Sequence, residues 1–150
     1  MKRRHVLLSL ALLSPLTAPV LAQSVNNLPG MTTVTFAPGS TSTTLAGQLA
    51  PGGRAVYYVL AKAGQTLNVS VMPGASGATF QVFHADATLA QGADGMPVVN
   101  GRTLPDAGPS DNAKAWIGAI PRDGNYPILV TMGGGSAAVP NPYNLTVSLQ

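Results

Sequence analysis

The 150-residue chain contains no cysteine and no glutamate. Without cysteine it forms no disulfide, no thiolate metal site, no cysteine nucleophile and no lipoprotein anchor. Long helices are rich in glutamate, lysine, leucine and arginine, whereas charged residues make up only 9% of this chain. Glycine and proline are abundant, at 17 and 13 residues. The composition therefore favours short strands joined by tight turns.

The first 22 residues have the pattern of a secretory signal peptide. Residues 2–4 are basic, residues 6–13 form an apolar stretch broken by one serine, and residues 20–22 (Val-Leu-Ala) are typical of a cleavage site before Gln23. The apolar stretch is too short to span a bilayer, so we expect no membrane anchor. The pattern predicts a bacterial protein that is periplasmic or secreted.

Removal of this leader changes the charge of the protein. Cleavage takes away three of the eight basic residues, and the remaining five balance the five aspartates. A basic surface for nucleic acid is therefore not expected. After a flexible terminus at 23–30, the remaining length, 31–150, suits a single domain with its own core. We expect this domain to be a monomer.

Alternation of apolar and polar residues predicts eight or nine short strands at a spacing of about ten residues. Residues 54–61 are apolar on both faces, so this strand is expected to be central. No segment has a helical period long enough to compete. The pattern predicts an all-β fold, an antiparallel two-sheet β-sandwich of jelly-roll-like type. The strands are expected over 31–36, 43–49, 54–61, 66–72, 78–84, 88–91, 114–120, 126–132 and 143–149.

The connections between these strands differ in length. Residues 62–65 form a hairpin-sized turn, and residues 121–124 (Pro-Arg-Asp-Gly) form a turn with proline first and glycine last. Residues 92–112 give the weakest signal for regular structure, since they contain three prolines, several glycines and three aspartates. A loop of this length in a compact domain is usually functional or mobile.

The residues that could carry catalysis do not form a recognisable site. His84 is the one histidine left after cleavage, and one histidine without cysteine cannot form a zinc site. The chain has no Gly-x-Ser-x-Gly sequence for a hydrolytic nucleophile. Asp94, Asp106 and Asp111 lack the close alternate spacing of a calcium loop. We therefore expect a protein that acts by binding, with no enzyme activity, no metal and no cofactor.

Four residues are candidates for contact with a partner: Arg54, Tyr57, Trp116 and Arg122. An exposed tryptophan can stack on a sugar ring or anchor a protein partner, although the phase of Trp116 in its strand favours the core. Tyr57 and the tyrosine after it point to opposite faces, so at least one of them is expected in the core. Arg54 and Arg122 stand in turns, where a solvated charge is the simpler interpretation.

Three stretches of the chain resemble a known pattern. The stretch 53–71 starts at Gly53 and continues as RAVYYVLAKAGQTLNVSV, and residues 120–130 read IPRDGNYPILV. They are similar to Tyr…Ala-x-x-Gly-Gln-x-Leu-x-Val-x-Val and Leu-Pro-x-x-Gly-x-Tyr-x-Ile-x-Val. Residues 143–147 match a closing Tyr-x-Leu-x-Val. This pattern occurs in bacterial pre-peptidase C-terminal-like β-sandwiches and in periplasmic inhibitors of g-type lysozyme.

The resemblance implies a function as well as a fold. A stand-alone chain with a signal peptide suits the inhibitors, which are expected to block the lysozyme cleft with loops gathered at one end of the sandwich. By this alignment the loops are 50–54 and 133–142. The matched residues are scaffold, so they assign no individual inhibitory residue. A carbohydrate- or cell-surface-binding module that uses exposed aromatics is the alternative, so the partner is expected to be a protein, possibly g-type lysozyme, or a glycan.

Overall fold

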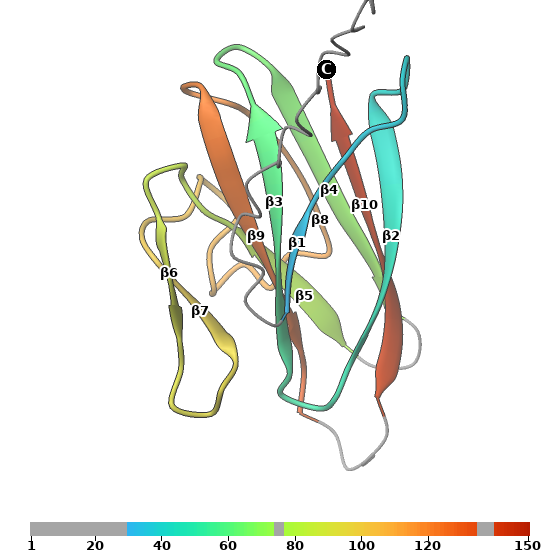
Figure 1. The fold of residues 1–150 in the computed structure, drawn as a ribbon, viewed down its shortest axis with the longest axis vertical. Helices are drawn as coiled ribbons and strands as arrows, with labels where there is room; N and C mark the ends of the chain where they lie inside the picture. The colour runs from blue at the N-terminus through green and yellow to red at the C-terminus, as the bar shows by residue number, and fades with distance from the viewer. Residues whose placement is uncertain (1–29, 74–76, 135–139) are drawn as a thin grey trace, which may run out of the picture.

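The computed structural model describes residues 30–73, 77–134 and 140–150. Within these ranges the chain forms ten strands and no helix, so it offers no helix that could cross a membrane. The predicted leader, nearly all of the predicted terminus at 23–30 and the middle of the predicted 133–142 loop lie outside the described residues. The strands (Figure 1) are β1 (Met31–Thr33), β2 (Ser42–Leu49), β3 (Arg54–Ala61), β4 (Thr66–Pro73), β5 (Ala78–Val82), β6 (Thr88–Gln91), β7 (Pro97–Asn100), β8 (Ala115–Ala119), β9 (Gly124–Met132) and β10 (Asn141–Leu149).

Eight of these strands form two four-stranded sheets. The first sheet has the order β1-β3-β9-β5, and the second has the order β2-β10-β4-β8. From β2 to β5, and again from β8 to β10, each successive strand lies in the other sheet, as in a jelly roll. The predicted sandwich is confirmed, and β3 is central as expected.

One strand pair departs from the predicted antiparallel arrangement. β1 runs parallel to β3, with Met31 opposite Val56. Parallel neighbours need a connection that crosses over and returns. Here the chain crosses to β2 in the second sheet and comes back, so β1 and β3 point the same way.

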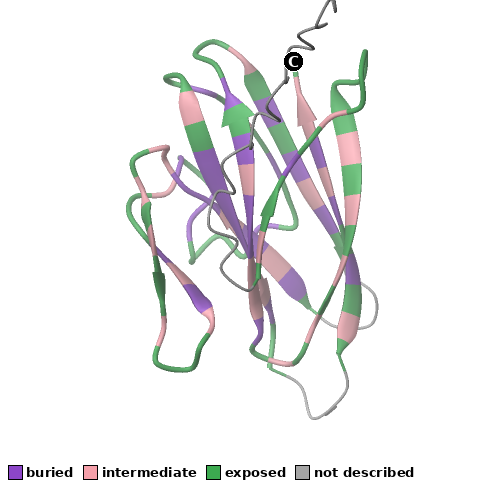
Figure 2. Ribbon diagram, in the orientation of Figure 1, coloured by how far each residue is buried: buried purple, intermediate pink, exposed green. Residues whose placement is uncertain are grey.

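The core lies between the two sheets, where the central strands carry most of the buried residues (Figure 2). The alternation read from the sequence holds along the central strands, because a period of two places every second side chain on the same face. The inward-facing residues are Val59 and Ala61 on β3, Leu67, Val69 and Val71 on β4, Phe80 and Val82 on β5, Tyr126, Ile128, Val130 and Met132 on β9, and Leu145 and Val147 on β10.

A hairpin of β6 and β7 covers part of the outer face of the first sheet (Figure 1). Val99 of β7 packs there with Val56, Leu129 and Phe83 in a second, smaller apolar cluster. This explains why residues 54–61 are apolar on both faces. The stretch 92–112, which gave the weakest signal for regular structure, contains one strand that the sequence did not predict, β7. Four residues are too few for a clear alternating signal, and the glycines and prolines around them obscured it.

Several element boundaries also differ from the prediction. The first strand ends at Thr33 instead of residue 36, although the Val34 amide still donates to the Tyr58 carbonyl at 2.7 Å. The strand predicted over 78–84 ends at Val82, and the last strand begins at Asn141. Residues 62–65 form a tight turn but not a hairpin, since β3 and β4 lie in opposite sheets.

Candidate functional site

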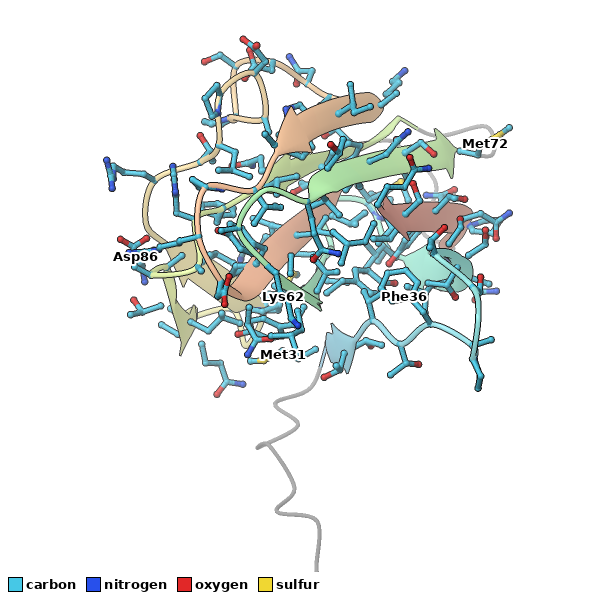
Figure 3. The ribbon with its side chains drawn as sticks, turned by 90° about the horizontal axis from the view of Figure 1, so that it is seen from above. Met31, Phe36, Lys62, Met72 and Asp86 are labelled. Carbon is cyan, nitrogen blue, oxygen red and sulfur yellow. The ribbon has the colours of Figure 1, made fainter. Side chains whose placement is uncertain are left out.

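Half of the ten charged residues in the described part of the chain gather at one end of the sandwich. We call this set, Lys62, Asp86, Arg102, Arg122 and Asp123, the charged end. Its residues stand in the connections between strands, which is where sandwich folds place their binding surfaces. Figure 3 views the molecule from above and shows Asp86 on the opposite side from Met72.

Two turns that cross between the sheets form the base of the charged end. The turn after β3 contains Lys62, and the turn before β9 contains Arg122 and Asp123. The Asp123 carboxylate accepts a hydrogen bond from the Ala63 amide at 2.8 Å, and the Gly64 amide donates to the Ile120 carbonyl at 2.9 Å. These bonds hold the two turns together.

The position of Arg122 is fixed by its own turn. The Tyr126 hydroxyl, on the buried side of β9, donates back to the Arg122 carbonyl at 2.7 Å. This is the arrangement of a tyrosine corner, in which a tyrosine at the start of a strand closes the turn before it. A Cβ at Gly124 would lie 2.5 Å from the Cβ of Ala85, so glycine there lets the segment before β6 approach β9 closely.

Asp86 is the centre of the charged end. Its carboxylate lies 3.1 Å from the Arg122 guanidinium and 4.0 Å from the Arg102 guanidinium. The side chains of Asp86, Arg102 and Arg122 are 50%, 81% and 53% exposed. Exposed ion pairs of this kind contribute about 0–1 kcal/mol, so either arginine exchanges its partner at little cost.

The structure does not bring the four candidate residues together. Arg122 is exposed at the charged end, whereas Arg54 begins β3 at the opposite end and pairs with Asp94 of the β6–β7 turn. Tyr57 is 6% exposed, and its hydroxyl lies 2.8 Å from that of Tyr143. Burial and this hydrogen bond raise the pKa of Tyr143 well above its usual range.

Trp116 is also a core residue. It is 8% exposed, and its indole Nε1 donates to the Pro105 carbonyl at 2.8 Å. None of the eight aromatic side chains, all of which fall in described residues, is exposed. The glycan-binding alternative relied on an exposed aromatic, and the described surface does not offer one.

Sequence reasoning missed Arg102 and Asp86. They are 16 residues apart, beyond the reach of any local pattern. They come together because the β6–β7 hairpin between them brings the chain back beside its own start. There the His84 amide donates to the Arg102 carbonyl at 2.9 Å, and the Ala87 amide donates to the His84 carbonyl. A search for charged residues beside predicted turns would have found Arg122 but not this cluster.

The two loops expected to reach a partner lie at the end opposite the charged end. The Gly52 amide donates to the Met132 carbonyl at 3.0 Å, and the Gly133 amide donates to the Gly77 carbonyl at 3.2 Å. The described parts of 50–54 and 133–142 therefore do gather, together with the start of β5. Arg54 and Asp94 are the charged residues that the structure describes near this end, and they bind each other.

Among the described residues no three histidine, cysteine, aspartate or glutamate side chains are placed to share a metal ion. The exposed charged end can instead form charge-assisted hydrogen bonds with a partner. Its guanidinium groups suit carboxylates in particular.

Comparison with solved structures finds the periplasmic inhibitor of g-type lysozyme from Aeromonas hydrophila, PliG. It is 34% identical and superposes with a TM-score of 0.57 over 80% of this chain and 96% of the inhibitor. The chain belongs to the family of periplasmic g-type lysozyme inhibitors. The predicted family is thereby confirmed.

Two further members share the fold at lower identity. PliG of Salmonella Typhimurium is 19% identical with a TM-score of 0.53, over 80% of this chain and 97% of that one. A mutant of the Escherichia coli inhibitor is 20% identical with the same TM-score and coverage. These relatives are inhibitors rather than enzymes, and all three are described as periplasmic. No family model and no curated protein sequence matches the chain.

Proposed function

We propose that this protein is an exported, non-catalytic inhibitor that binds a g-type lysozyme and covers its cleft. Membership of the inhibitor family, through the 34% identity to the Aeromonas inhibitor, carries the proposal. The exposed guanidinium groups of the charged end add to it, because they give the described surface groups that bind another protein well.

The charged end is the part of the described surface best suited to the contact. A muramidase is a glycosidase, and glycosidases carry carboxyl groups in the cleft beside the scissile bond. Arg102 and Arg122 present two guanidinium groups on neighbouring loops, each able to bind a carboxylate through two parallel hydrogen bonds. The proposal therefore keeps Arg122 as a contact residue, as the sequence predicts, and adds Arg102 to it.

Asp86 keeps the two arginines close together before binding. Because the Asp86 pairs are exposed and weak, a lysozyme carboxylate replaces Asp86 without a large penalty. The tyrosine corner below Arg122 limits the freedom that binding would otherwise remove, and a preorganised contact loses less entropy on association.

Leu60 adds an apolar contact to this end. Leu60 is 67% exposed and points away from the core on β3. It lies opposite Asn125, the second residue of β9, and therefore close to the turn that contains Arg122. An apolar side chain at the same end of the sandwich as two arginines offers a partner apolar contact area in addition to charge.

The compartment in the proposal rests on the leader. Residues 1–22 direct export and are removed, residues 23–30 precede the domain, and residues 31–150 fold as one sandwich. The periplasmic relatives support the same compartment.

Charge removal at the arginine pair tests the contact. Arg102→Ser and Arg122→Ser together are expected to weaken inhibition of a g-type lysozyme at least ~30-fold, since a central arginine contributes about 2 kcal/mol or more to such interfaces. Lys114→Ser is the matched control, because Lys114 is exposed and precedes β8, at the far end of that strand from the Arg122 turn. An unchanged inhibition constant in the double variant, with wild-type unfolding, would move the contact elsewhere.

A further inference from the structure

The outer face of the second sheet carries no charge. Its strands β2, β4, β8 and β10 contain no lysine, arginine, histidine or aspartate at any position. Soluble domains usually cover an exposed sheet face with polar side chains, many of them charged. Here most of the outward-facing positions carry hydroxyl or amide side chains instead. Nucleic acid and anionic lipid bind through basic residues, so this face suits neither of them.

The hydroxyl groups stand in register across neighbouring strands. Thr44 of β2 lies opposite Thr146 of β10, and their hydroxyl oxygens are 3.0 Å apart. Thr146 in turn lies opposite Ser70 of β4. A hydroxyl group both donates and accepts hydrogen bonds, so this row offers both functions along the surface of the sheet. Such a surface suits a ligand that is polar but uncharged.

The same face has an open groove where β2, β10 and β4 lie side by side. Its volume is about 540 Å³, and ligand sites in proteins typically measure about 300–1,000 Å³. The exposed side chains that line it are Ala46 and Gln48 of β2, Pro142 and Asn144 of β10, and Met72 of β4. They belong to the end of the sandwich opposite the charged end, as the position of Met72 in Figure 3 shows.

The groove combines two side-chain amides with small apolar groups. Gln48 and Asn144 lie on neighbouring strands, and each offers an amide N–H donor and a carbonyl acceptor. The Met72 side chain beside them is 69% exposed, and a flexible thioether adapts to small apolar groups. An acetamido group has the complementary parts, namely a carbonyl, an N–H and a methyl group. We propose that this groove binds a chain of N-acetylated amino sugars through their acetamido groups.

The apolar side chains of this face are not arranged as a protein interface. Met72 and Ile117 are both exposed, but Ile117 lies opposite Asn68, which is four residues from Met72 along β4. Protein interfaces gather aromatic and other large apolar side chains at a buried centre. Here the two large apolar residues stand singly among hydroxyl and amide groups. This arrangement favours a hydrogen-bonding polymer as the ligand.

The groove differs from the glycan-binding module that the sequence left open, because it needs no exposed aromatic. Hydrogen bonds to acetamido groups take the place of stacking. A single sugar is therefore held weakly, and a chain gains from several contacts made at once. The site does not depend on the proposed inhibition, because a ligand in the groove leaves the charged end free.

Matched tetrasaccharides test the role of the acetamido groups. In NMR titrations of the purified exported protein, millimolar chitotetraose is expected to shift the backbone amide signals of Ala46, Met72 and Asn144. Cellotetraose has the same linkage without acetamido groups and is expected to leave these signals in place. Gln48→Ala with Asn144→Ala is expected to weaken chitotetraose binding at least ~10-fold, because hydrogen bonds to the ligand are lost. Asn68→Ala, an exposed position of the same face outside the groove, is the matched control and is expected to bind as the wild type does.

Co-sedimentation distinguishes two sources of such chains. Insoluble peptidoglycan and insoluble chitin are each expected to retain the wild-type protein and to release the double variant. Retention by chitin alone would support the acetamido chemistry and exclude the cell wall as the source. The double variant is expected to inhibit a g-type lysozyme as the wild type does, so a failure of this proposal is distinguishable from a failure of the inhibition.

Three results would overturn the proposal. Equal shifts with chitotetraose and cellotetraose exclude recognition of the acetamido group. Groove signals that do not move in millimolar chitotetraose exclude the ligand. A double variant that binds chitotetraose as tightly as the wild type excludes this groove. Circular dichroism of each variant establishes that lost binding is not a lost fold.

Discussion

The hydroxyl groups of Tyr57 and Tyr143 lie 2.8 Å apart inside the core, although the two residues belong to opposite sheets. The same Tyr143 ring covers Gly47 of the neighbouring strand, where an added Cβ would come within 2.4 Å of the ring. Glycine opposite an aromatic ring in a strand pair is a close-packed arrangement that a larger residue would disrupt. One tyrosine thus connects β2 and β10 of one sheet with β3 of the other.

Removal of one hydroxyl of this pair is expected to lower the free energy of unfolding more than removal of both. Tyr143→Phe leaves the buried Tyr57 hydroxyl without its partner, and such a group costs about 1–3 kcal/mol of unfolding free energy. Tyr57→Phe together with Tyr143→Phe removes both polar groups and should be closer to the wild type. Urea unfolding of the wild type, the two single variants and the double variant measures the coupling. Strictly additive costs would show that the two hydroxyls do not interact.

The tyrosine pair also predicts a loss of stability in alkali. Burial, and then the hydrogen bond between Tyr143 and Tyr57, raise the pKa of Tyr143 above that of an unfolded tyrosine, and burial raises the pKa of Tyr58. The unfolded chain therefore gives up these protons at lower pH than the folded chain. The stability that comes from this pKa difference is fully present below the unfolded pKa of about 10. It is lost as pH rises from there towards the folded pKa.

Urea midpoints measured from neutral pH to about pH 11 test whether stability falls in alkali, since unfolded tyrosine ionises near pH 10. The wild-type midpoint should fall at the alkaline end, and the Tyr143→Phe variant should fall less steeply. A wild-type midpoint that stays level or rises in alkali would contradict the assignment.

Trp116 should behave as a core residue in unfolding experiments. Trp116→Ala is expected to cost about 3–5 kcal/mol, because the side chain is 8% exposed and its Nε1 is hydrogen-bonded. Gly118→Ala is expected to destabilise as well, since its new Cβ would lie 2.2 Å from the indole ring. Urea unfolding followed by circular dichroism measures both. A cost for Trp116→Ala under ~0.5 kcal/mol, as at surface sites, would contradict its burial.

The strands were predictable because their signal is local. In β4, Leu67, Val69 and Val71 alternate with polar residues, and the structure buries all three. The position of Trp116 in the alternating pattern of its strand also favoured the core, and the structure buries it. β7 was missed because four residues starting at a proline carry little pattern, and the parallel β1–β3 pair was missed because strand direction depends on which sheet each strand joins.

The charged end was less accessible to sequence reasoning. Arg122 could be singled out, because a Pro-Arg-Asp-Gly turn exposes its second residue. Arg102 and Asp86 could not, because their proximity depends on how the β6–β7 hairpin returns the chain. Arg54, which stood in a similar turn, binds Asp94, a partner 40 residues away. Turn position alone does not distinguish Arg122, whose side chain is 53% exposed, from Arg54, whose side chain is 27% exposed.

Titration of the purified exported protein into a g-type muramidase, with c-type and i-type enzymes in parallel, tests the account most directly. The account predicts saturable loss of g-type lytic activity near equimolar protein, with little effect on the other two classes. Full g-type activity in a large excess of correctly folded protein would contradict it, and would leave the family fold without the proposed function.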